Sequence, residues 1–259
     1  MREPALRLYP APGGEVDPGS IYADLDLPAG DPYLVFTMVS TVDGKAAQGG
    51  RANPIGSDLD HLLMRRIRSA VDAVMSGAGT LRAEGVDLGV PEEMARKRVS
   101  SGLREQPLQV IVTGSGELPL ERRIFREAGD DLLVIVSEAT PEEKVREISR
   151  RTTVRRVAGD PEPEVQEVVG LLRREFGVRR LAVEGGPRLN HSLVAAGLAD
   201  ELFLTLAPKV IGGSSVPTIV AGEELPEDEV ARLRLLSVYL QGSELYLRYR
   251  FTGGEGNSL

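Results

Sequence analysis

Three glycine-containing turns are the segments of this 259-residue chain best suited to chemistry. They are residues 76–80 (SGAGT), 113–116 (TGSG) and 184–187 (EGGP), and each follows an apolar run typical of a buried strand. Small residues at a strand exit let backbone N–H groups approach a phosphate, and a helix that starts there adds its positive end. Three such turns favour a bound nucleotide or dinucleotide. None matches G-x-G-x-x-G in a Rossmann unit, and no Gly-Lys-Ser/Thr of a Walker A loop occurs.

Charged side chains near these turns are candidates for the reacting groups. Asp43-Gly44-Lys45 is either a solvated turn or a means of directing the Lys45 ammonium into a cleft, where it could hold an anionic or carbonyl-like group or donate a proton. Glu184, beside two glycines, is either an exposed cap or a polar contact to substrate or cofactor. His61 and His191 fall on predicted helices and are assigned surface or packing roles.

Composition excludes several classes of protein. The chain has no cysteine and two histidines, which excludes a disulfide scaffold, a thiolate nucleophile and a His-rich metal site, so no metal is expected. A net charge of −8 disfavours nucleic acid and anionic lipid as partners. No apolar run approaches the length of a membrane span, and residues 1–4 lack the apolar core of a signal peptide. A cytoplasmic protein with a small-molecule substrate is expected.

The turns need a sheet to position them. Apolar runs alternate with helical patterns through the middle of the chain, which predicts an α/β sandwich with a mixed, mostly parallel sheet and a C-terminal antiparallel hairpin around Gln241-Gly242. Ligands of such sheets bind beyond the carboxyl ends of the strands. Residues 31–252 are predicted to form one domain, preceded by an extended arm (1–30) that is flexible or packed along the domain, and followed by a tail (253–259). The polar segment 85–106 is a mobile flap or a short helix with loops.

Several motifs together resemble one family. They are residues 40–45 (STVDGK), 68–81 (RSAVDAVMSGAGTL), 184–189 (EGGPRL), 196–201 (AGLADE) and 207–213 (APKVIGG). In their order and spacing, the chain resembles the pyrimidine reductases of riboflavin biosynthesis, the C-terminal reductase domain of a bifunctional deaminase-reductase. This resemblance covers about residues 32–251 and implies a dihydrofolate-reductase-like three-layer sandwich, with a homodimer as the expected assembly.

The resemblance also implies an activity and a set of site residues. NADPH would reduce the ribosylamino side chain of a pyrimidine 5′-phosphate to the ribitylamino form, as in a 5-amino-6-(5-phosphoribosylamino)uracil reductase. Lys45, Asp43 and Glu184 would be the catalytic residues, and Arg68 and Leu88 would bind substrate. The residues implied to bind the cofactor are Val39, Gly77, Gly79, Thr80, Glu84, Thr113, Ser115, Gly185, Gly186, Pro187 and Leu189.

Departures from the family pattern leave the substrate open. The family commonly has Asp-Asp-Pro-x-Leu-Thr-x-Arg after the helix that follows the 76–80 turn, where this chain has residues 84–91 (EGVDLGVP), with Pro91 at the place of a phosphate-binding arginine. Ala52 and Pro54 replace a serine and an aromatic residue. The alternatives are a reductase of a pterin, for which no buried carboxylate facing the ring is evident, and a non-catalytic nucleotide-binding module. The possible substitutes for the missing arginine are Arg96, Lys97, Arg98 and Arg104.

Overall fold

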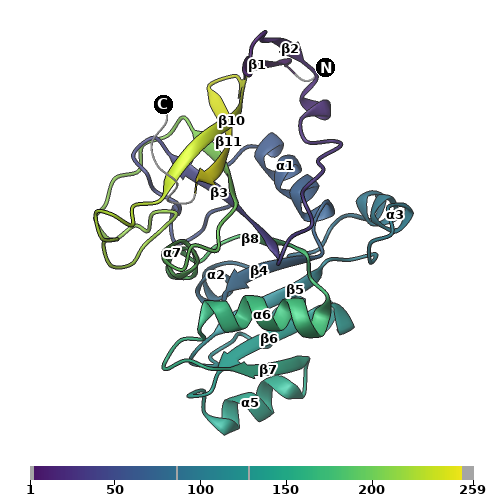
Figure 1. Cartoon of the computed structure of the whole chain (residues 1–259), viewed down its shortest axis with the longest axis vertical. Coiled ribbons are helices and arrows are strands. Elements are labelled where there is room, and N and C mark those ends of the chain that lie inside the picture. Colours follow the sequence, from purple (N-terminus) through teal and green to yellow (C-terminus); the bar gives the residue numbers. More distant parts are fainter. Residues whose placement is uncertain (1–2, 86, 128, 253–259) are drawn as a thin grey trace.

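A single mixed sheet runs through the protein (Figure 1). The computed structural model describes residues 3–85, 87–127 and 129–252, so the predicted tail 253–259 lies outside the described residues. Among them, no helix is long and apolar enough to cross a lipid bilayer. The strands are β1 (Ala5–Tyr9), β2 (Gly14–Val16), β3 (Tyr33–Thr41), β4 (Ala73–Gly77), β5 (Leu108–Thr113), β6 (Leu132–Ser137), β7 (Thr153–Val157), β8 (Arg180–Val183), β9 (Glu201–Ala207), β10 (Arg232–Gln241) and β11 (Glu244–Thr252).

The strand order is β2-β1-β10-β11-β9-β3-β8-β4-β5-β6-β7. All neighbours from β9 to β7 pair in parallel, whereas β9 to β2 pair antiparallel. The predicted mixed, mostly parallel sheet with a C-terminal hairpin, β10 and β11, is therefore confirmed. The parallel strands all end at the same edge of the sheet, which brings the three glycine turns to that edge.

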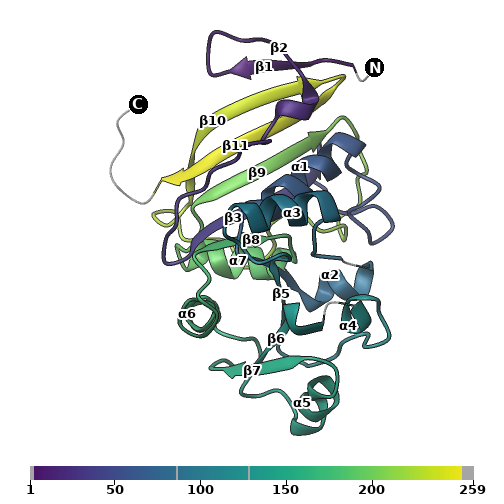
Figure 2. The same ribbon diagram turned by 90° about the vertical axis from the view of Figure 1, so that its right-hand side faces the viewer.

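Helices cover both faces of the sheet and complete a three-layer sandwich (Figure 2). Their bounds are α1 (Asp58–Ser69), α2 (Ala78–Ala83), α3 (Glu92–Ser100), α4 (Ile124–Glu127), α5 (Glu142–Ser149), α6 (Val165–Phe176) and α7 (Pro187–Ala195), with 3₁₀ turns at Pro18–Ser20 and Gly129–Asp131. Side chains of α6 and α7 join one apolar core, and those of α1, α2, α4 and α5 join the other. Strands β4, β5, β6 and β8 between these layers are buried along nearly their whole length, as expected for a sheet covered on both faces.

Helix α1 carries much of the site, and its sequence explains its position. Leu59, Leu63 and Ile67 repeat at intervals of four residues and are buried, which holds one face of the helix against the sheet. Ser57 is the N-cap, as predicted, and its hydroxyl accepts from the backbone N–H of Asp60. The opposite face of α1 is left free to line a cleft.

Two predicted helix starts need correction. The sequence of residues 140–143 (TPEE) predicts Thr140 as the N-cap of a helix that runs to about residue 150, but α5 begins at Glu142 with Pro141 as its N-cap. The Thr140 hydroxyl instead donates to the carbonyl of Gly114 at 2.6 Å, so it supports the turn after β5. The turn at residues 76–80 predicts a helix over about residues 80–84, whereas α2 begins two residues earlier, at Ala78. In the segment 85–106, the structure shows a short helix, α3, with loops on either side.

The N-terminal arm packs along the domain. Strand β1 pairs with β10, and β2 pairs with β1 at the edge of the sheet. Ile21 and Leu27 are buried. The guanidinium of Arg66 on α1 donates to the backbone carbonyls of Gly19 and Ile21, each at 2.5 Å. Apolar burial and charge-assisted hydrogen bonds therefore fix the arm against α1.

Candidate active site

Two cavities meet at the carboxyl edge of the sheet. The larger, of about 990 Å³, lies between α1, the end of β3 and the segment that follows α2. The smaller, of about 420 Å³, lies between the ends of β4 and β5 and the start of α7. Thr80 lines both cavities, so a ligand that fills the smaller one can reach into the larger. Among the described residues, no group of three or more His, Asp or Glu side chains is arranged to hold a metal ion.

The smaller cavity contains most of the residues predicted to bind a cofactor. Eight of them line it: Gly77, Gly79, Thr80, Thr113, Ser115, Gly186, Pro187 and Leu189. The backbone N–H of Gly77 donates to the carbonyl of Gly185 at 2.9 Å, which joins the turn after β4 to the turn after β8. The turns that were predicted separately from sequence thus form one continuous wall.

The absence of side chains at these glycines leaves room for a ligand. A Cβ at Gly79 would have no atom within 4 Å, and one at Gly186 would meet only the Thr80 hydroxyl, at 3.6 Å. Helix α7 begins at the same wall, with Gly186 as its N-cap, and its positive end favours an anion. Arg82 and Arg188 also line this cavity. An elongated anionic ligand such as a dinucleotide fits this lining.

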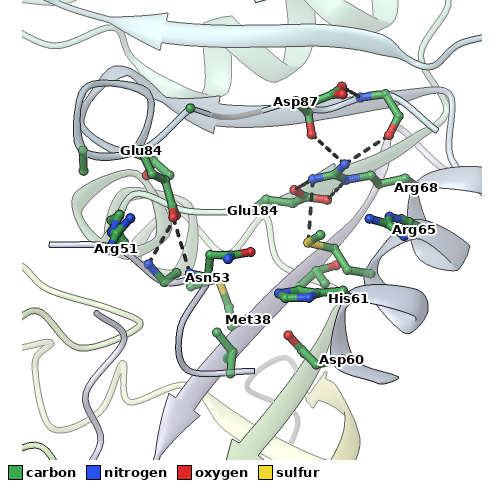
Figure 3. Close-up of a pocket in the computed structure, with 18 of the residues that line it drawn as sticks. Met38, Arg51, Asn53, Asp60, His61, Arg65, Arg68, Glu84, Asp87 and Glu184 are labelled. Atoms are coloured by element: carbon green, nitrogen blue, oxygen red, sulfur yellow. Dashed lines mark hydrogen bonds and ion pairs between the residues drawn. The ribbon is translucent and has the colours of Figure 1, made fainter. Parts of the chain in front are cut away.

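One face of α1 forms a side of the larger cavity, hereafter the cleft (Figure 3). Asp60, His61, Met64, Arg65 and Arg68 all line it, and their spacing of three and four residues places them on one helix face. His61, for which the sequence predicts a surface or packing role, lies at the surface of this cleft. His191 lies outside both cavities, where its ring contacts the carbonyl of Glu223 at 2.6 Å.

Arg68 and Glu184 form a buried ion pair in the cleft. Two nitrogens of the guanidinium donate to the two carboxylate oxygens, each at 2.6 Å, and both side chains are 7% exposed. Arg68 also donates to the carbonyls of Asp87 and Gly89. Burial lowers the pKa of Arg68, but the charge of Glu184 and its hydrogen bonds outweigh burial, and the net pKa is raised. The pair joins α1 to the turn after β8, as a bidentate contact does.

Asp60 is the one strongly perturbed carboxyl group among the described residues of the cleft. Burial raises its pKa to about 7, a hydrogen bond with Thr205 acts in the opposite direction, and the negative charges of Glu244 and Glu184 raise it further. A carboxyl group whose pKa lies near neutral pH in a cleft is a candidate functional group. The sequence analysis missed it, because an Asp in the first turn of a helix is ordinary.

Two predicted ligand-binding residues lie elsewhere than expected. Glu84, predicted at the cofactor, lines the cleft instead, and its carboxylate accepts from the backbone N–H groups of Ala52 and Asn53 at 3.3 and 3.4 Å. Leu88, predicted at the substrate, is fully buried in the core with α1 and α2. It anchors the loop whose carbonyls bind Arg68. Val39 does line the cleft, as a residue near the reacting end of a cofactor should.

Asp43 and Lys45 lie beside the two cavities without lining either. The Asp43 carboxylate accepts from the Thr41 hydroxyl and from the backbone N–H groups of Ile211 and Gly212. These bonds, with that of Thr41 first, lower its pKa to about 2. This geometry gives Asp43 the role of tying the turn after β3 to the 209–213 loop. The ammonium of Lys45 approaches the carbonyl of Val216, at 3.5 Å.

The four basic residues considered as substitutes for the family arginine all have other partners. Arg98 is 1% exposed, and its guanidinium donates to backbone carbonyls at the end of α1. Arg96 pairs with Glu92, Lys97 with Asp24 and Arg104 with Asp131. None of the four lines the cleft, so this expectation is wrong. The described arginines that line it are Arg51, Arg65, Arg68, Arg122 and Arg123.

Comparison with known proteins agrees with this geometry. Residues 32–247 match the family described as the RibD C-terminal domain. A 2,5-diamino-6-ribosylamino-4(3H)-pyrimidinone 5′-phosphate reductase of Archaeoglobus fulgidus is 37% identical over 74% of this chain and 87% of its own length. A protein of the same name from Methanothermobacter thermautotrophicus is 30% identical over 86% of this chain and 99% of its own.

Solved structures show the same fold. A pyrimidine reductase-like protein of Corynebacterium diphtheriae superimposes with a TM-score of 0.74 at 20% identity, over 92% of this chain and 99% of its own. RibD of Acinetobacter baumannii does so with a TM-score of 0.68, also at 20% identity, over 85% of this chain and 58% of its own.

The fold places the chain in one class, the proteins with a dihydrofolate-reductase-like fold. Within that class, the chain belongs to the RibD C-terminal domain family, the reductases of riboflavin biosynthesis. The family predicted from sequence motifs is therefore confirmed.

Proposed function

We propose that this protein is an NADPH-dependent reductase of a ribosylamino-pyrimidine 5′-phosphate. The observation that carries the proposal is the meeting of the two cavities at Thr80, with Val39 and Glu184 on the cleft side and the glycine turns on the other. This arrangement supports a dinucleotide in the smaller cavity whose reactive end enters the cleft beside the substrate. The protein's contribution is to position the two and to exclude water.

The chain's own residues have defined tasks in this proposal. The turn amides and α7 would hold the dinucleotide, and a bound reduced nicotinamide would supply a hydride to C1′ of the ring-opened sugar in its N-protonated imine form, which gives the secondary amine directly. Arg68 orients Glu184 toward the substrate. Lys45 directly precedes Ala46, which lines the cleft, and its ammonium approaches the Val216 carbonyl. From this place it is proposed to stabilise the opened sugar. The 2′-phosphate on the adenosine ribose of NADPH would lie near Thr113 and Ser115, and the positively charged Arg82 lines the same cavity.

The test is NADPH oxidation with three substrates in parallel: the 2,5-diamino-6-ribosylamino-4(3H)-pyrimidinone 5′-phosphate, the corresponding 5-amino-6-ribosylamino-uracil 5′-phosphate, and dihydrofolate. Turnover of either pyrimidine supports the proposal. Turnover of dihydrofolate alone would replace it with the pterin alternative, which Asp60 favours because it is a partly buried carboxyl group in the cleft. Tight NADPH binding without turnover of any substrate would indicate a non-catalytic nucleotide-binding module.

The cofactor position makes a separate prediction. Gly79→Leu adds a side chain that meets no protein atom near its Cβ but enters the smaller cavity. The variant should fold normally, while its dissociation constant for NADPH, measured by calorimetry, rises at least ~10-fold from steric exclusion. Gly79→Ala, which adds one methyl group, is the matched control and should change the constant less. Unchanged affinity in the leucine variant would place the cofactor elsewhere.

The substrate phosphate needs a cation other than the family arginine. Arg68 is engaged by Glu184 and Arg123 by Glu127. The structure records no hydrogen bond from the guanidinium of Arg65 to any residue it describes, and Figure 3 shows Arg65 beside Arg68 on α1. We expect Arg65→Gln to raise KM by roughly 10- to 100-fold for the phosphorylated substrate, since a charged hydrogen bond contributes ~1.5–3 kcal/mol.

The control for this prediction is the dephosphorylated ribosylamino-pyrimidine, whose KM should change little. Arg123→Gln is the matched variant, because that arginine also lines the cleft but is already paired. Equal losses with both substrates would show that Arg65 does not hold the phosphate. A homodimer stays a prediction from the family resemblance, and a cytoplasmic location stays one from the composition.

A further inference from the structure

The carboxyl group of Asp60 is held at a fixed place in the wall of the cleft. It projects from the first turn of α1, and Figure 3 shows it pointing into the cleft below His61. The backbone of Gly56 closes its rear side: a Cβ at Gly56 would lie 2.0 Å from Oδ2 of Asp60, so only glycine leaves room for the carboxyl group there. Its position is set by backbone rather than by a flexible side chain.

Two threonines lie beside Asp60: Thr37 lines the cleft with it, and Thr205 joins both in the lining of a small adjoining pocket. Thr37 of β3 and Thr205 of β9 are on the sheet face toward α1, because Val39, two residues after Thr37, pairs with Thr205 in the parallel register. Thr205 forms a hydrogen bond with Asp60. The hydroxyl of Thr37 is shielded from solvent and has no partner among the described residues. Thr37 and Asp60 line the cleft together.

This corner has hydrogen-bonding capacity that the protein itself does not use. The structure records no ion pair between Asp60 and any described lysine or arginine, while the neighbouring Glu184 is fully engaged by Arg68. A shielded polar group without a partner is costly unless a ligand supplies one. In its ionised form the Asp60 carboxylate only accepts hydrogen bonds, so a ligand edge that presents two donors both satisfies it and favours that form.

Ring edges of the two candidate pyrimidines differ at this point. A 2-amino-4(3H)-pyrimidinone presents the 2-amino group and the ring N3–H side by side, two donors that match the two oxygens of one carboxylate. A uracil ring presents a carbonyl oxygen in place of the amino group, and that oxygen would face a carboxylate oxygen. Opposed acceptors with no donor between them are strongly disfavoured in a shielded site.

The geometry points to Asp60, supported by Thr37 and Thr205, as the residue that binds the amino and N–H edge of the substrate ring and selects the 2-amino-pyrimidinone over the uracil. This inference rests on the proposed function, since it assigns the ring end of the same substrate. It makes Asp60 a specificity-determining residue of the cleft.

The test is a change of substrate preference in Asp60→Asn. An asparagine amide presents one donor and one acceptor, which suits the uracil edge and not the 2-amino edge. We expect wild-type protein to favour the diamino substrate by roughly 10-fold or more in kcat/KM. In the variant, kcat/KM for the diamino substrate should fall ~10-fold or more while that for the uracil substrate stays or rises. Asp58→Asn, an exposed position in the same turn, should leave the ratio unchanged.

A merely structural role for Asp60 would lower both values by the same factor, and that result, or a wild-type preference for uracil, overturns the inference. A second readout separates it from the proposed function. Binding of the ring fragments 2,5,6-triamino-4(3H)-pyrimidinone and 5,6-diaminouracil is measured by calorimetry without turnover. If wild-type protein turns over neither substrate, the proposed function fails. If Asp60→Asn then reverses the preference between the two fragments, Asp60 is still supported as the residue that binds the ring edge. If wild-type protein shows no preference between the fragments, the inference about Asp60 is overturned.

Discussion

Asp60 and Glu184 are two carboxyl groups of one cleft with different surroundings. Glu184 accepts two charge-assisted hydrogen bonds from Arg68, whereas Asp60 is shielded near the negative charges of Glu244 and Glu184. The first environment holds a fixed negative charge in place, and the second disfavours one. At the scale of single residues, the cleft therefore combines a neutralised ion pair with a carboxyl group that titrates near neutral pH.

This difference predicts a pH-dependent stability. The pKa of Asp60 is about 7 in the folded protein and near ~3.9 in an unfolded chain, so the folded state holds this proton more tightly between those values. Ionisation of Asp60 therefore lowers the free energy of unfolding as the pH rises through that window. The asparagine in Asp60→Asn cannot ionise. The free energy of unfolding of this variant, relative to that of wild type, should therefore increase by about 1–3 kcal/mol from pH 4 to pH 8.

Urea denaturation at both pH values measures this effect, with Asp58→Asn as the exposed control. The groups that face Asp60 and share its electrostatic environment are His61 of α1, Glu184, and Glu244 and Tyr246 of β11. A constant difference between wild type and Asp60→Asn across the pH range would show that Asp60 is not shifted.

Helix α1 is the element that organises the cleft, and three other parts of the chain hold it. Its N-cap residue Ser57 donates to Glu244 of β11. Arg66 ties it to the N-terminal arm. At its other end, the Arg98 guanidinium of α3 donates to the carbonyls of Arg68, Ser69 and Val71. A cation at a helix C-terminus satisfies carbonyls that have no partner within the helix.

Arg98 should accordingly matter for stability rather than for direct contact with substrate. Arg98→Leu removes the donor and leaves buried carbonyls unsatisfied, which should lower the free energy of unfolding by about 2–4 kcal/mol. Arg96→Leu is the control on the same helix: Arg96 is exposed and, among the described residues, forms an ion pair with Glu92, so its loss should cost under ~1 kcal/mol. Chemical denaturation measures the free energy of unfolding of both variants. Equal free energies of unfolding would contradict this role of Arg98.

At the scale of the whole molecule, one sheet joins the N-terminal arm, the C-terminal hairpin and the parallel core. The short strands β1 and β2 lie outside β10, so the arm covers an edge that would otherwise present unpaired backbone groups. Strand β10 is ten residues long and contains several apolar side chains. The arm is thus placed to prevent association through that edge.

Removal of residues 1–17 tests this role. The shortened chain should expose β10 and associate, which light scattering would detect as a rise in mass over the full chain at equal concentration. Replacing Lys144, far from this edge, with Gln is a control that should leave the mass unchanged. If the shortened chain has the same oligomeric state as the full chain, the edge of β10 does not need the arm to prevent association.

What the sequence alone determined is local. Apolar runs and glycine turns marked most of the strands, the capping signals at Ser57 and Gly177 marked helix ends, and the motifs around Lys45, Gly79 and Gly186 indicated the family. These features depend on interactions within a few residues, on backbone conformations that glycine favours, or on short motifs, so they can be read from neighbouring positions.

Tertiary structure decided which side chains reach a ligand. The rotation of α1 against the sheet turned Asp60 and His61 into the cleft, while the fold buried Leu88 in the core and Arg98 beneath the end of α1. Arg68 meets Glu184 across 116 residues of chain. Local sequence does not encode such pairings, because they arise when elements distant along the chain pack and exclude water from the groups between them.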